Sequence, residues 1–117
     1  MEQRRCPRFP VRFRSSFTSA NVVGGEGSVI DLSIRGCRVD SNVTVMPGTT
    51  LELRIHATEH EPPIAVDQAI VRWARNHLFG VEFMSLQPGE WARLQHLVKE
   101  LEQEPYVKKA ADEASSS

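Results

Sequence analysis

Hydrophobic and polar residues alternate along most of the chain with a period of two, which is typical of β-strands that bury one face. The first such run begins at Val11, where Val11, Phe13 and Phe17 fall on one side and Arg12 and Arg14 on the other. Further runs cover residues 28–32, 37–40, 49–56, 64–74 and 78–84. Turn-forming residues separate these runs, so the pattern predicts about six antiparallel strands.

The pattern then changes to the period of an amphipathic helix, expected over residues 88–104. Its apolar stripe consists of Trp91, Leu94, Leu97, Val98 and Leu101. Pro88 suits the first turn of a helix, and Pro105 limits its length. Short strands with regular turns and no crossover helices favour a closed or nearly closed barrel. The predicted fold class is therefore an all-β, six-stranded antiparallel barrel capped by one C-terminal helix.

The 117 residues allow one domain. We expect residues 1–10 to form a flexible arm, residues 11–104 the barrel domain, and residues 105–117 a disordered tail. No apolar run approaches the roughly 20 residues that span a bilayer. No apolar stretch of a secretory signal follows the N-terminal arginines either, so we expect a cytoplasmic protein without a membrane partner. A net charge of −1 argues against bulk coating of nucleic acid.

Positive charge is concentrated at the N-terminal end. Residues 1–14 contain one acid, Glu2, and five arginines: Arg4, Arg5, Arg8, Arg12 and Arg14. An anionic ligand should therefore meet this end first. A solvated arm that attracts anions without specificity is the alternative interpretation.

Two motifs stand on either side of the first predicted strand. The first is RxxxR, formed by Arg4 and Arg8, and the second is DxSxxG over residues 31–36. In this order, together with Val71-Arg72-Trp73 and the later run from Phe79 to Phe83, they resemble the signature of PilZ domains. That family consists of cyclic di-GMP receptors built on a six-stranded barrel with a C-terminal helix. The resemblance covers roughly residues 2 to 103.

The resemblance implies a set of ligand-binding residues. Arg4 and Arg8 would contact guanine and phosphate, with Arg5 as a helper. Asp31 would accept hydrogen bonds from a guanine edge, and Ser33 would donate its hydroxyl to the ligand. Gly36 would allow the sharp turn and a close approach of the ligand. Further candidates are Arg35, Arg38 and Trp73.

The chemistry of arginine suits cyclic di-GMP independently of the family resemblance. Its planar guanidinium can donate two hydrogen bonds to guanine, pair with phosphate or stack on a base. Arginines on a mobile arm could close over cyclic di-GMP and change the surface offered to a downstream protein partner. No cofactor is expected beyond the ligand. Gln3, ahead of the first motif arginine, favours one bound ligand over a stacked pair, by family resemblance.

Other interpretations of the same residues stay open. Arg8 and Arg12 also satisfy RxxxR. Asp31 and Ser33 could be a turn-capping pair. Trp73 and Trp91 favour core or helix packing, although an exposed Trp73 could stack on a ligand.

Some readings are disfavoured. The glycine-rich stretch up to Gly27 predicts a hairpin connection rather than a phosphate loop. The sequence shows no nucleophile paired with a base and no residue spacing typical of metal ligands. We therefore do not expect an enzyme.

Two other classes of function compete with the receptor hypothesis. A PilZ-like module could work through protein contacts alone, without responding to nucleotide, but the intact motifs argue against this. A small β-barrel that binds RNA or single-stranded DNA would use the same arginines. Such barrels display exposed aromatic residues on one sheet face. Here the phenylalanines fall on inward positions, so nucleic acid is a disfavoured partner.

Overall fold

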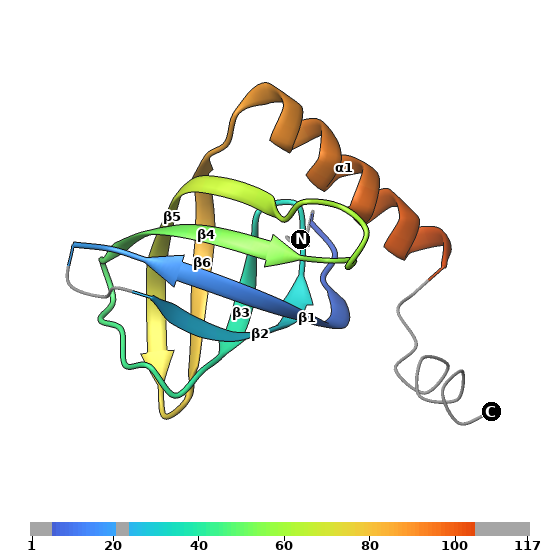
Figure 1. Cartoon of the computed structure of the whole chain (residues 1–117). Coiled ribbons are helices and arrows are strands. Elements are labelled where there is room, and N and C mark those ends of the chain that lie inside the picture. The colour runs from blue at the N-terminus through green and yellow to red at the C-terminus, as the bar shows by residue number, and fades with distance from the viewer. Residues whose placement is uncertain (1–5, 21–23, 105–117) are drawn as a thin grey trace.

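The computed structural model describes residues 6–20 and 24–104, which form a closed antiparallel barrel with one helix (Figure 1). The elements are β1 (Phe9–Thr18), β2 (Gly25–Leu32), β3 (Gly36–Asp40), β4 (Thr50–His56), β5 (Ile64–Arg75), β6 (Leu78–Ser85) and α1 (Pro88–Gln103). Around the barrel the strands follow the order β1-β2-β3-β6-β5-β4, and β4 closes on β1. The predicted six-stranded barrel with a C-terminal helix is confirmed.

The first strand begins two residues earlier than the sequence predicted. Phe9 and Pro10 belong to β1, and Pro10 pairs with Asp31 of β2. The assignment of residues 9 and 10 to a flexible arm was therefore wrong. A proline lacks the backbone N–H that a strand ladder uses, but it is tolerated near a strand start or bulge. Here the register shifts between Pro10 and Phe13.

The second strand also begins earlier, inside the glycine-rich segment that was predicted as a loop up to Gly27. Gly25 pairs with Phe17 and Gly27 with Ser15. A Cβ on Gly25 would come within 2.3 Å of the Phe17 ring. Absence of a side chain thus lets this fully buried ring lie against the strand.

The core fills the barrel interior with the inward residues of all six strands. Phe17 and Phe79 meet edge to face, with ring centroids 5.4 Å apart. Cys37 is fully buried in the same core, and burial raises the pKa of its thiol. This cysteine therefore acts as a small apolar residue.

Helix α1 follows β6 and lies beside the barrel (Figure 1). Its buried residues Leu94, Val98 and Leu101 join the barrel core. Trp91 packs partly buried against the core, as predicted. The Glu90 side chain accepts a hydrogen bond from the backbone N–H of Ala65 at 2.9 Å, which ties the helix to β5. Within the described residues, no helix has the length and apolarity needed to cross a membrane.

Candidate functional site

A solvent-open cleft lies where the β2–β3 turn meets β5 and β6. Its lining comprises Cys6, Arg8, Ser33, Arg35, Gly36, Arg72, Trp73, Gly80, Val81 and Glu82. The chain segment before β1 thus faces residues of three later strands. Five of the residues predicted from sequence lie here: Arg8, Ser33, Gly36, Arg35 and Trp73. Arg4 and Arg5 lie outside the described residues.

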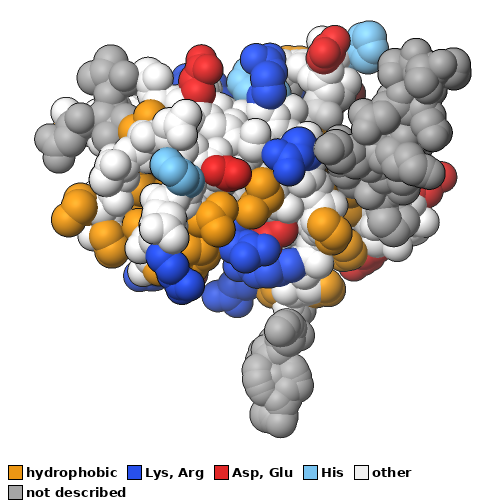
Figure 2. Space-filling model, turned by 90° about the horizontal axis from the view of Figure 1, so that it is seen from below, with side chains coloured by type: hydrophobic (Ala, Val, Ile, Leu, Met, Phe, Trp, Pro, Cys, Tyr) orange, Lys and Arg blue, Asp and Glu red, His pale blue; other side chains and the backbone are white. Residues whose placement is uncertain are grey.

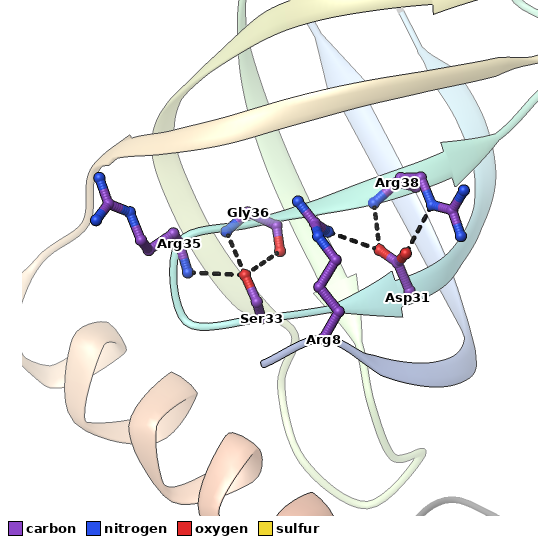
Figure 3. Close-up of polar contacts among 6 residues, drawn as sticks. All are labelled: Arg8, Asp31, Ser33, Arg35, Gly36 and Arg38. Atoms are coloured by element: carbon purple, nitrogen blue, oxygen red, sulfur yellow. Dashed lines mark hydrogen bonds and ion pairs between the residues drawn. The ribbon is translucent and has the colours of Figure 1, made fainter. Parts of the chain in front are cut away.

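Asp31 joins two arginines into one cluster beside this cleft (Figure 3). Its Oδ1 accepts a hydrogen bond from Arg8 at 2.9 Å, and its Oδ2 accepts one from Nε of Arg38 at 2.6 Å. The backbone N–H of Arg38 also donates to Oδ1, at 3.2 Å. Only 8% of the Asp31 side chain is exposed, against 49% for Arg8. A carboxylate this buried needs such partners, so Asp31 holds both arginines in place.

A β-bulge explains why Asp31 points to the outer side of the barrel, where Arg8 and Arg38 lie against it. Simple alternation places Asp31 on the same side as Val29, which is fully buried. The register shifts between these two residues, so Asp31 pairs with Arg38 while Val29 pairs with Val39. Directly paired residues of antiparallel strands point to the same side. The bulge thereby turns the carboxylate to the face of Arg38.

Ser33 builds the turn between β2 and β3. Its hydroxyl donates to the carbonyl of Gly36 and accepts from the backbone N–H groups of Arg35 and Gly36, at 3.1 to 3.3 Å (Figure 3). The residue is 1% exposed. These contacts support the turn-capping interpretation for Ser33, while hydroxyl donation to a ligand stays a prediction.

Gly36 is required for a reason that the sequence did not reveal. The glycines with positive φ among the described residues are Gly24 and Gly48, so Gly36 does not need the left-handed region. A Cβ on Gly36 would instead come within 2.2 Å of the carbonyl oxygen of Val81 on β6. Glycine thus lets β3 and β6 approach closely where the turn meets the cleft.

Trp73 on β5 forms part of the cleft wall opposite the β2–β3 turn, and it lies outside the core. It pairs with Gly80, and a Cβ on Gly80 would lie 2.3 Å from the indole Nε1. The indole therefore rests on the backbone of β6 and remains partly exposed. The core-packing interpretation of Trp73 was wrong. A register shift between Val71 and Trp73 turns the indole away from the side of the buried Val71.

Glu82 and Arg72 complete this wall, although no motif in the sequence marks either of them as a site residue. Glu82 Oε1 accepts from Nε of Arg72 at 2.8 Å, and Arg35 lies 3.8 Å from Oε2. Their outward alternation on β5 and β6 was the available signal, although exposed charged residues on strands rarely mark a site. Arg12, the alternative motif arginine, is exposed on β1 and is not among the cleft residues.

Positive charge dominates the cleft. Its described lining contains three arginines, Arg8, Arg35 and Arg72, and one carboxylate, that of Glu82. Figure 2 shows several Lys and Arg side chains side by side near the lower edge of this face and others further up among acidic side chains. No group of acidic, histidine or cysteine residues within the described ranges could hold a metal ion. The cleft suits an anionic ligand with an aromatic part, because guanidinium groups lie next to a partly exposed indole, and the Arg75 guanidinium lies over that ring, 5.9 Å from its centroid.

The PilZ domain profile matches residues 2–100 of the chain. The protein therefore belongs to the PilZ family. No protein of curated function matches the chain.

Solved structures share this fold. The PilZ domain of YcgR from Escherichia coli, determined with c-di-GMP, superposes with a TM-score of 0.72 at 14% identity, covering 99% of this chain and 100% of that one. The Bacillus subtilis inhibitor of motility, MotI/DgrA, gives a TM-score of 0.69 at 16% identity and 89% coverage of this chain. This chain covers only 54% of that protein's length. The PilZ domain of CeSA from a cellulose-synthesizing bacterium gives 0.64 at 19% identity, with 82% and 98% covered.

Proposed function

We propose that this protein is a receptor for cyclic di-GMP, which it binds in the arginine-lined cleft without chemical change. The observation that carries the proposal is the convergence of Arg8, Asp31 and Arg38 beside a cleft that also contains Trp73. Cyclic di-GMP presents two phosphates and two guanines. Guanidinium groups can bind both, and an indole can stack on a base. Membership of the PilZ family and the YcgR neighbour determined with c-di-GMP support the same ligand.

Arg8 is the residue on which capture of the ligand depends. About half of its side chain is exposed while one nitrogen is paired with Asp31, so donors remain for phosphate or guanine. Asp31 thus aims the guanidinium at the ligand site. Arg4 and Arg5, four and three residues before Arg8, would add further cations when the arm closes. Ordering about five residues costs roughly 5 to 10 kcal/mol, which four to six charge-assisted hydrogen bonds can offset.

The change of surface on ligand binding depends on where the N-terminal arm joins the barrel. Arg8 immediately precedes β1, so an arm ordered by the ligand would cover the β2–β3 turn and change the surface at this rim. A downstream protein in the cytoplasm would then recognise the changed surface. Binding at about −8 kcal/mol, near micromolar, would suit such a reversible signal.

Tryptophan emission tests whether the ligand binds at this cleft. The chain has two tryptophans, the partly exposed Trp73 in the cleft and Trp91 packed against the core. Titration with cyclic di-GMP should change the emission because a guanine stacks on the Trp73 indole. Trp73→Phe should abolish the change while retaining most of the affinity, since a phenyl ring still stacks. Trp91→Phe should preserve the change; a signal that disappears only in this control would place the ligand elsewhere.

A further inference from the structure

Glu82 is the only carboxylate among the described residues that line the cleft. Asp31 does not line it, is 8% exposed and accepts three hydrogen bonds from Arg8 and Arg38. The side chain of Glu82 is 33% exposed. A ligand in the cleft therefore meets the carboxylate of Glu82 more directly than that of Asp31.

One oxygen of Glu82 keeps capacity to accept hydrogen bonds. Arg72 approaches Oε1 with Nε at 2.8 Å and with a terminal nitrogen at 2.7 Å. The contact at Oε2 is the ion pair with Arg35, whose 3.8 Å separation exceeds a hydrogen bond. Arg72 thus fixes the carboxylate through one oxygen, and the other remains available to a donor group.

The position of Trp73 brings a stacked base close to this oxygen. Trp73 pairs with Gly80, and Glu82 follows two residues later on β6, on the same face of the strand. Two residues of a strand span about 7 Å. A base lying on the indole would therefore lie near Glu82, with Arg35 and Arg72 in the same cleft to pair with a phosphate.

We infer that Glu82 accepts hydrogen bonds from the edge of one guanine and so selects guanine over adenine. This inference rests on the proposed function, because it concerns how the same cleft reads its ligand. Guanine presents two adjacent donors, N1–H and the 2-amino group, and the remaining oxygen Oε2, with its two lone pairs, can accept from them. Adenine presents an acceptor at N1, which repels a carboxylate. Cyclic di-GMP has two guanines, so the role that the family resemblance gives to Asp31 remains available for the second one.

The test compares cyclic di-GMP with cyclic di-AMP, which carries the same phosphates and sugars. Both affinities are measured by isothermal titration for the wild-type chain and for Glu82→Gln. Glutamine keeps the size but replaces one acceptor with an amino donor that suits adenine N1. The preference for cyclic di-GMP should fall about tenfold or more, the factor that loss of one hydrogen bond to a charged group implies.

A matched control is Glu52→Gln on β4, an exposed carboxylate outside the cleft lining, which should leave the preference unchanged. Glu82→Asp keeps the acceptors and should still prefer guanine. If Glu82→Gln weakened both nucleotides by the same factor, Glu82 would only hold Arg72, and the inference would be overturned while the proposed function stood. If the wild-type chain bound no cyclic di-GMP, both would be overturned.

Discussion

Replacing Arg8 with alanine should weaken cyclic di-GMP binding by about 2 kcal/mol or more, because charge-assisted hydrogen bonds to the ligand are lost. Arg8 lines the cleft and is aimed by Asp31 at 2.9 Å. The loss corresponds to roughly a thirtyfold rise in Kd, which isothermal titration resolves.

Arg12→Ala is the matched control for this variant. Arg12 has the same charge, lies four residues later and is exposed on β1 outside the cleft lining. Its replacement should change Kd by less than about threefold, since only long-range attraction is lost. Equal losses in the two variants would mean that overall charge attracts the ligand, or that Arg8 and Arg12 form the working motif pair. Either result contradicts the site described above.

Gly36→Ala should lower the free energy of unfolding by about 2 to 3 kcal/mol. The added Cβ would meet the Val81 carbonyl at 2.2 Å, and backbone cannot rotate away as a side chain can. Strands β3 and β6 must then separate at the point where the cleft is formed. Denaturation in urea measures the loss.

Gly89→Ala provides the comparison because Gly89 lies in α1 and its added Cβ meets nothing within 4 Å. That variant should be neutral or more stable by up to about 1 kcal/mol, as alanine favours a helix. If Gly36→Ala behaved in the same way, the close approach of β3 and β6 would not be what requires glycine at this position.

The barrel could be predicted from the sequence because the alternation of apolar and polar residues shows directly which face of a strand is buried. Phe17, Leu53 and Phe79 lie inside as their positions predicted. The first residues of the strands were harder to predict, since Pro10 and Gly25 have poor strand propensity on their own. Their strand conformation comes from pairing with β2 and β1, which is a tertiary effect.

The site was predicted less completely because bulges interrupt the alternation there. Two register shifts, before Asp31 in β2 and before Trp73 in β5, turn both residues outward. No local sequence signal marks either shift. Motif resemblance identified Asp31 without the bulge, whereas for Trp73 core or helix packing was favoured and an exposed, stacking indole was kept as the alternative. Glu82 had neither a motif nor an unusual position, and only the fold brings it beside Trp73 and Arg72.

The most direct test of the account is isothermal titration of the full 117-residue chain with cyclic di-GMP. We predict saturable binding with a Kd near the micromolar range, about −8 kcal/mol. Raised salt should weaken it, because the arginines pair with phosphates. Absence of binding heat at ligand concentrations of roughly ten times that Kd, confirmed by an unchanged amide spectrum for Arg8 and Ser33, would contradict the proposal that this cleft is a nucleotide receptor.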